Sequence, residues 1–175
     1  MSEIDELPRE RLLALLKIFA KNWLAHDGLW FQAVERVHGM EHAIDLDAEA
    51  WKQFSPIEAK RIKDFLGLPD HGGLEALKTA LEYRLYASLN KQCSELKGGV
   101  LLFYMNDCRV QSARKRKGLP DFPCKKVGLV EYSTFAAEID PRIKTDCIAC
   151  PPDEHPDDYY CGWKFWIEDE RDRSS

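Results

Sequence analysis

Several features that would identify a class of protein are missing from this 175-residue sequence. No apolar run approaches the ~18 residues that a membrane-spanning helix needs. The opening residues, MSEIDE, are acidic where a signal peptide is basic. We therefore expect a cytoplasmic protein without a membrane partner.

Familiar catalytic and nucleotide-binding motifs are missing as well. The sequence contains no GxGxxG, GxxxxGKS/T, GxSxG or HExxH pattern, so glycine-rich phosphate cradles and serine-hydrolase elbows have no support. The net charge is −5, which disfavours a polyanion, and we expect no nucleic acid partner. The short basic run at 114–117 is typical of a solvated loop.

The sequence does contain six cysteines, five of which follow residue 107. In a reducing compartment they are better explained as metal ligands, redox thiols or small buried apolar residues than as disulfides. Cys147 and Cys150 form a CxxC pair, the spacing at which two thiolates bind one metal ion. The other candidates occur singly, so the spacing alone does not define a ligand set.

The candidate metal ligands are four of these thiols, Cys124, Cys147, Cys150 and Cys161. Cys108 or His155 is an alternative for one of them. Thiolate ligands favour zinc, and an iron–sulfur cluster is the second choice because Pro151 follows the CxxC pair, as in bacterial ferredoxins. Cys93 lies among polar neighbours and is expected to be a bystander.

The periodicity of apolar residues predicts an α+β fold and a single domain over residues 1–175. Residues 1–97 are expected to be helical. The expected helices are 12–24, 29–37, 41–54, one that begins at a Ser55-Pro56-Ile57-Glu58 capping box and ends at Gly67, and a long one over 74–96.

Strand character begins after the Gly98-Gly99 pair. Residues 98–168 are expected to form a β-hairpin (100–105 with 108–111), a helix (125–139) and two strands (142–149 and 160–167), with the cysteine cluster among them. A Pro-rich loop separates the last two strands, since proline does not join a sheet interior. Residues 169–175 are expected to be a charged tail.

Three residues are candidates for binding a small molecule. Arg109 has a guanidinium fork that could hold a carboxylate through two parallel hydrogen bonds, although a surface ion pair is the commoner role. Trp30 and Tyr86 are candidates to line a pocket between the helices and the sheet, although aromatic residues at helical spacing are more often plain core.

The stretch from Cys108-Arg109-Val110-Gln111 to Tyr160-Cys161-Gly162-Trp163 resembles an uncharacterised bacterial family described only as cytosolic proteins. More distantly, the C-terminal half resembles 4-vinyl reductase-type ligand-binding domains and the L-2-amino-thiazoline-4-carboxylic acid hydrolase family. The hydrolase likeness places Cys124 at a helix start, followed by Asp140, Arg142 and a terminal strand, 161–165. It implies N-terminal helices packed on a small antiparallel sheet formed by the C-terminal half.

The leading hypothesis is a zinc-binding domain that binds or senses a small molecule. The alternative is a hydrolase of a cyclic amide-like or amidine bond, with Cys124, Asp140 and His155 as candidate catalytic residues. A third reading is a scaffold in which metal only holds the C-terminal loop. Whether the protein is an enzyme stays open, and a homodimer is compatible with the sequence.

Overall fold

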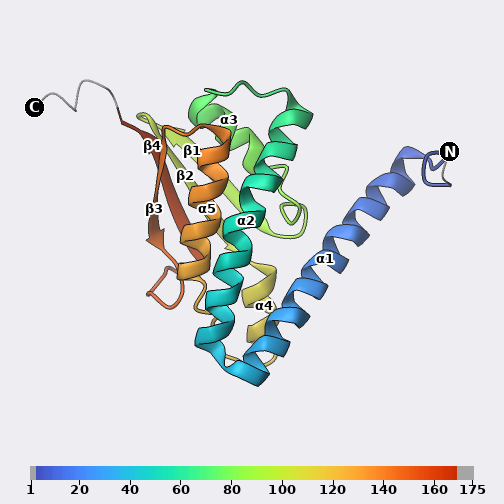
Figure 1. Cartoon of the computed structure of the whole chain (residues 1–175), viewed down its shortest axis with the longest axis vertical. Coiled ribbons are helices and arrows are strands. Elements are labelled where there is room, and N and C mark those ends of the chain that lie inside the picture. The colour runs from blue at the N-terminus through green and yellow to red at the C-terminus, as the bar shows by residue number, and fades with distance from the viewer. Residues whose placement is uncertain (1–2, 169–175) are drawn as a thin grey trace, which may run out of the picture.

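The computed structural model describes residues 3–168, which form helices packed on a four-stranded sheet (Figure 1). The helices are α1 (Arg9–His38), α2 (Met40–Leu66), α3 (Gly73–Leu81), α4 (Arg109–Arg116) and α5 (Lys125–Ile139). The strands are β1 (Lys91–Lys97), β2 (Val100–Asp107), β3 (Ile143–Ala149) and β4 (Cys161–Ile167). The predicted α+β class, with N-terminal helices and a small antiparallel sheet, is confirmed.

The strands lie in the order β1-β2-β4-β3, and each neighbouring pair is antiparallel. Side chains alternate between the two faces of a sheet, and on β2 the residues Leu101, Phe103 and Met105 are buried while those between them are only half-buried. Helix α5 lies against the buried face, α2 packs on α5, and α1 packs on α2 (Figure 1). These three helices therefore stack outward from one face of the sheet.

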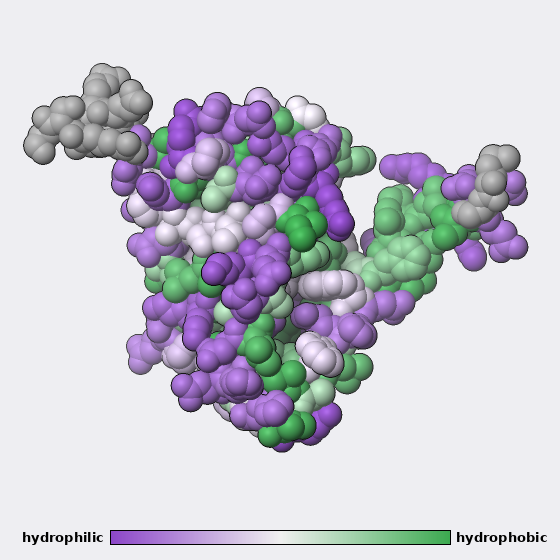
Figure 2. Space-filling model, viewed as in Figure 1, coloured by the Kyte–Doolittle hydropathy of each residue, from purple (hydrophilic) through white to green (hydrophobic). Residues whose placement is uncertain are grey.

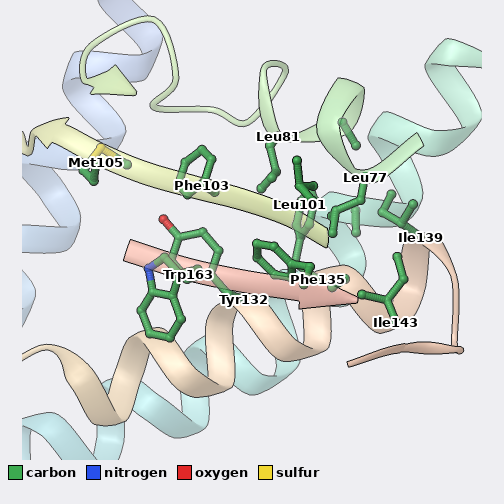
Figure 3. Packing of buried hydrophobic residues seen from close by; sticks show 14 of the residues in the cluster. Leu77, Leu81, Leu101, Phe103, Met105, Tyr132, Phe135, Ile139, Ile143 and Trp163 are labelled. Atoms are coloured by element: carbon green, nitrogen blue, oxygen red, sulfur yellow. The ribbon is translucent and has the colours of Figure 1, made fainter. Parts of the chain in front are cut away.

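The core lies between the sheet and α5 (Figure 3). Trp163 on β4 is fully buried and stacks on Tyr132 of α5 at a ring-centroid distance of 4.7 Å. Phe103 on β2 approaches the same tyrosine at 5.5 Å. Burying each of these large side chains contributes about 1.5–3 kcal/mol, so this contact fixes α5 on the sheet.

The long helix α2 corrects one prediction. Ser55 and Pro56 do not begin a helix but lie inside α2, which runs on to the left-handed cap at Gly67. The Ser55 hydroxyl is buried and has no hydrogen-bond partner among the described residues. Glu58 does not reach back to cap the helix, because its carboxylate instead receives hydrogen bonds from Arg84.

The prediction of one helix over 74–96 is also wrong. The expectation that residues 1–97 are entirely helical is wrong for the same reason. Helix α3 ends at Leu81, and residues 91–97 form the edge strand β1. The side-chain amide of Gln92 donates to the Leu81 carbonyl at 3.1 Å, which helps the chain to reverse. The strand alternates between exposed and half-buried residues and turns into β2 through two glycines with positive φ.

Residues 108–111 were expected as the second strand of a hairpin, and this is wrong. They begin α4, and the hairpin partner of β2 is β1. The Ser112 hydroxyl donates to the Asp107 carboxylate at 2.7 Å, which stabilises the start of the helix. The helix over 125–139, both later strands and the irregular Pro-rich loop are confirmed, while the predicted tail at 169–175 lies outside the described residues.

The first half of α1 stands away from the rest of the molecule (Figure 1). Apolar side chains remain exposed along this helix, and Figure 2 shows green surface on the projecting part. The exposed large apolar residues of α1 are Leu13, Leu16, Ile18, Phe19, Leu29, Trp30 and Val37. No helix in residues 3–168 combines the length and apolar character needed to cross a bilayer.

Candidate ligand-binding site

A cavity of about 970 Å³ lies between the C-terminal half of α1 and the rest of the molecule. Parts of α1, α2, α4, α5, β2 and β4 and of the segment between α3 and β1 all contribute to its wall. Ligand-binding pockets typically enclose about 300–1,000 Å³ and are mostly apolar with a few polar groups. The size and lining of this cavity match that description.

Aromatic side chains form much of the wall. Trp23 on α1 meets Trp51 on α2 edge-on, with ring centroids 5.8 Å apart. Tyr86 lies 6.3 Å from Trp51, and Phe31 meets Phe122 at 4.8 Å. All five line the cavity, so it offers several aromatic edges and faces to a ligand.

Three carboxylates line the same cavity: Asp27 on α1, Asp47 on α2 and Glu131 on α5. Burial, together with the neighbouring charges of Asp27 and Glu131, raises the pKa of Asp47 to about 7. Burial and Glu131 also raise the pKa of Asp27. The indole N–H of Trp51 is the hydrogen-bond donor that favours the charged form of Asp47. These acids are therefore poorly solvated and repel one another.

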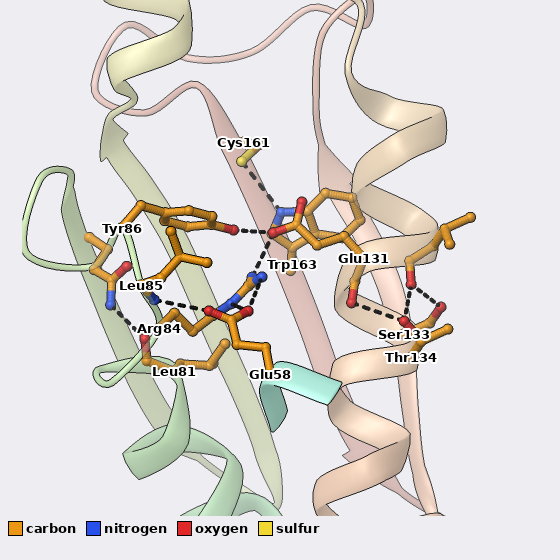
Figure 4. Close-up of polar contacts among 12 residues, drawn as sticks. Glu58, Leu81, Arg84, Leu85, Tyr86, Glu131, Ser133, Thr134, Cys161 and Trp163 are labelled. Carbon is orange, nitrogen blue, oxygen red and sulfur yellow. Dashed lines mark hydrogen bonds and ion pairs between the residues drawn. The ribbon is translucent and has the colours of Figure 1, made fainter. Parts of the chain in front are cut away.

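Glu58, Arg84, Tyr86 and Glu131 form a buried cluster of charged and polar side chains (Figure 4). The Arg84 guanidinium donates to Glu58 through Nε at 3.0 Å and Nη2 at 2.9 Å, and to Glu131 through Nη1 at 2.6 Å. The hydroxyl of Tyr86 donates to the same Glu131 oxygen. Arg84 also stacks on Tyr86, with its guanidinium carbon 4.8 Å from the ring centroid.

This cluster was not predicted from the sequence, although the sequence contains one signal of it. Arg84 is a charged residue inside a run of leucines at helical spacing, between Leu81 and Leu85. A charge in such a position is almost never buried unless it is paired. The cluster fixes the orientation of Tyr86 and Glu131, both of which face the cavity.

Four of the cysteines, Cys108, Cys124, Cys150 and Cys161, line one region of the cavity. The sulfur atoms of Cys124 and Cys150 are 3.5 Å apart, and the Cys150 thiol also shares a hydrogen bond with Cys161. The Trp163 indole donates to the Cys161 sulfur at 3.4 Å (Figure 4). Contact with the other two thiols raises the pKa of Cys150 far above its usual range, and burial raises that of Cys108 to about 12. Cys108 and Cys150 are therefore protonated thiols at neutral pH.

Cys147, the other half of the CxxC pair, lies on β3 and is not part of the cavity lining. Burial raises its pKa to about 11. Among residues 3–168, no group of three or more His, Cys, Asp or Glu side chains is arranged to hold a metal ion. A metal site would therefore need the thiols to deprotonate and move.

The three candidate catalytic residues lie in different places. Cys124 precedes α5 and lines the cavity, whereas Asp140 follows α5. Because this helix has 15 residues, its two ends are roughly 22 Å apart. His155 lies in the Pro-rich loop and faces Asp121, with Nε2 at 3.5 Å from the carboxylate.

Asp140 has a structural role instead. Its carboxylate accepts hydrogen bonds from the Gly73 amide at 3.0 Å and from Arg142 through Nε at 2.9 Å and Nη2 at 2.6 Å. These donors hold the pKa of Asp140 well below its usual range. The carboxylate joins the start of α3 to the end of α5, and Asp140 does not line the cavity.

Two of the three candidate ligand-binding residues line the cavity, and the third does not. Tyr86 is buried and Arg109 is exposed, and both line the cavity. The Arg109 backbone N–H donates to Asn90 at 3.0 Å, and its exposed side chain lies at the cavity rim. Trp30 is 69% exposed on α1 and does not line the cavity.

Comparisons with known proteins place the fold. No curated protein matches the chain. The solved structure of the phenol-responsive sensory domain of the transcription activator PoxR with phenol is similar, with a TM-score of 0.52 and 16% sequence identity over 82% of this chain and 73% of that one. Residues 5–167 match a family of unknown function, DUF6125. The match covers nearly the whole chain, which therefore belongs to DUF6125.

Proposed function

We propose that this protein is a small-molecule-binding sensory domain whose ligand occupies the cavity beside α1. The observation that carries the proposal is the 970 Å³ aromatic cavity itself, which has the size and lining of ligand pockets. The likeness to a phenol-responsive sensory domain supports it at the level of fold.

The position of α1 explains how binding can become a signal. Residues of this helix, from Lys21 to Arg36, form one side of the cavity, while its first half projects from the molecule (Figure 1). A ligand that contacts both α1 and the sheet ties the helix to the body. Ligand binding therefore increases the population of the α1 orientation that binds the ligand more tightly. The size of this shift depends on the difference in ligand affinity between the two orientations.

A glycine in the wall allows a direct test. Gly28 lies within α1 and lines the cavity, and a β-carbon added there meets nothing within 4 Å. Gly28→Phe puts a ring into this open space, whereas Gly28→Ala adds one methyl group and is the matched control. Phenol is the probe, and the fluorescence of Trp23 and Trp51 reports its binding.

We expect phenol to quench or shift the emission of the wild type and of Gly28→Ala, and to leave Gly28→Phe unchanged. Circular dichroism establishes that both variants are folded. Equal responses from Gly28→Phe and Gly28→Ala contradict binding in this cavity.

Zinc binding is a second candidate, supported by the approach of Cys124, Cys150 and Cys161. Thiolates suit zinc, and the cost of deprotonating such thiols is met only when the metal binds. An iron–sulfur cluster is the alternative. Elemental analysis of protein purified without added metal is expected to give one zinc per chain, lost in Cys150→Ser and kept in Cys93→Ser. Folded protein without metal contradicts this candidate.

The ligand set has two forms that the same analysis separates. Cys108 lines the cavity with the other three thiols, whereas the sequence pattern favoured Cys147. Loss of zinc in Cys108→Ser but not in Cys147→Ser supports a set that contains Cys108. Loss of zinc in Cys147→Ser but not in Cys108→Ser supports a set that contains Cys147.

The other interpretations have less support. Hydrolysis with Cys124 as nucleophile would need a partner other than Asp140, which lies beyond the far end of α5. The exposed apolar residues of α1 favour a homodimer. The homodimer, the cytoplasmic location and the absence of a nucleic acid partner stay predictions.

A further inference from the structure

The cavity has an unusual charge arrangement for one that is mainly aromatic. Among residues 3–168, no lysine, arginine or histidine forms an ion pair with Asp27 or Asp47, although both are half-buried and line the cavity. Glu131 is bonded to Arg84, but Arg84 is shared with Glu58, so this cluster keeps one excess negative charge. The interior therefore holds more acid than base.

The basic residues of the lining do not correct this excess. Lys21, Arg36, Arg109, Arg116 and Lys117 line the cavity but are exposed, so they form its rim. Their charges are solvated and their effect at a distance is screened. Arg114 is half-buried and lies 3.7 Å from Glu35. The groups that face the two aspartates come instead from α1 (His26), α5 (Glu131) and the wall (Trp51).

Aromatic rings lie beside these carboxylates. Trp51 is one turn from Asp47 on α2 and donates its indole N–H to that side chain. Trp23 and Tyr86 flank Trp51 in the wall. Aromatic faces attract organic cations, most strongly in desolvated sites, and a buried carboxylate without a partner is costly unless it is protonated or paired.

We propose that the ligand of this cavity is an organic cation, a protonated or quaternary amine on an apolar or aromatic body, with its positive charge between Asp27 and Asp47. The proposal rests on the proposed small-molecule function and specifies its ligand class. The cation supplies the missing partner of the two carboxylates, and its apolar body fills the space bounded by Trp23, Trp51 and Tyr86. Arg109 is exposed at the rim, and its charge is too well solvated to outweigh the cavity carboxylates and favour an anionic ligand.

Four probes each contain one benzene ring and together cover three charges. Benzyltrimethylammonium is a cation, benzyl alcohol and phenol are neutral, and benzoate is an anion. Titrations followed by tryptophan fluorescence at pH 8 are expected to give benzyltrimethylammonium at least about tenfold tighter binding than benzyl alcohol, with benzoate weakest. Asp47→Asn and Asp27→Asn are expected to reduce this preference to about twofold or less. Asp45→Asn, an exposed carboxylate on the same helix paired with Lys126, is the matched control and is expected to keep it.

The wild type supplies an independent measurement, because benzyltrimethylammonium keeps its charge at every pH. Its affinity is expected to fall about tenfold between pH 8 and pH 5.5, as the cavity carboxylates gain protons, while that of benzyl alcohol stays constant. Binding of phenol or benzyl alcohol equal to or tighter than the cation overturns the inference and leaves the proposed function standing. Tightest binding of benzoate also overturns it, in favour of Arg109. No binding of any probe overturns both.

Discussion

Gly128 on α5 lies directly against the ring of Trp163 on β4. A β-carbon at position 128 would be 2.6 Å from Cζ2 and 2.8 Å from Cη2 of that ring. Glycine is therefore required where the helix crosses the sheet, and the missing side chain lets the fully buried indole stack on Tyr132.

This contact predicts opposite effects for the same substitution at two helical positions. Gly128→Ala is expected to destabilise the protein by about 1–3 kcal/mol, because Trp163 is held on all sides and the overlap cannot relax. Gly28→Ala, where the added carbon meets nothing, is expected to stabilise by up to about 1 kcal/mol through helix propensity. Urea unfolding of both variants measures the difference. Equal effects would show that α5 does not pack this closely.

The Arg84 cluster predicts a large loss of stability on truncation. Arg84→Met leaves Glu58 and Glu131 buried without their shared cation, and is expected to cost about 3–5 kcal/mol. Arg61→Met, at an exposed position on α2, is the control and is expected to change the free energy of unfolding by less than about 0.5 kcal/mol. A loss below about 1 kcal/mol for Arg84→Met would mean that the cluster is solvated.

Asp140 predicts an effect on acid stability. Its pKa is depressed in the folded protein and ordinary in the unfolded chain, so its stabilising effect is complete above about pH 4 and is lost as the pH falls further. Asp140→Asn is expected to cost about 2–3 kcal/mol at pH 7, and the loss should shrink below pH 4. Asp64→Asn removes only a surface pair with Lys60 and serves as the control. A pH-independent loss would contradict the ionic role.

The raised pKa of Asp47 leads to a prediction of the opposite pH dependence for the free energy of unfolding. Its pKa is raised from 3.8 to about 7 in the folded protein, so the folded state binds the proton more tightly than the unfolded chain. The free energy of unfolding of the ligand-free protein should therefore fall as the pH rises from about 4 to about 7. Asp47→Asn is expected to flatten this slope and to be more stable than the wild type at pH 8. Urea titrations at pH 5 and pH 8 test it, and an unchanged slope would show that Asp47 is solvated.

The sequence predicted the α+β class because the local signals agree with the final packing in the C-terminal half. Gly98 and Gly99, the apolar run of β2 and the aromatic run of β4 each specify one structure. The prediction for the region between Leu81 and Lys97 was wrong because the spacing of its leucines is typical of a helix. In the folded protein, Arg84 instead pairs with Glu58 and Glu131 in the core. That requirement depends on residues far apart in the sequence, and no local pattern contains it.

The candidate site was predicted in part. Tyr86, Arg109 and three of the four proposed thiols line the cavity, but the aspartates were not singled out. Asp27 and Asp47 look like ordinary solvated positions on amphipathic helices, and only the packing of α1 on α2 buries them. Trp30 was expected at the pocket, but it lies on the uncovered side of α1.

The most direct test of ligand binding in the cavity uses the five tryptophans as reporters. Indole N–H signals in a proton–nitrogen correlation spectrum are followed during titration with benzyltrimethylammonium and with phenol. Trp23, Trp51 and Trp163 line the cavity, whereas Trp30 is exposed and Trp166 stacks under Lys164. The account predicts that the first three signals move with a common saturation curve and that the last two stay in place. Movement of Trp30 or Trp166 alone, or no movement with either probe, would contradict it.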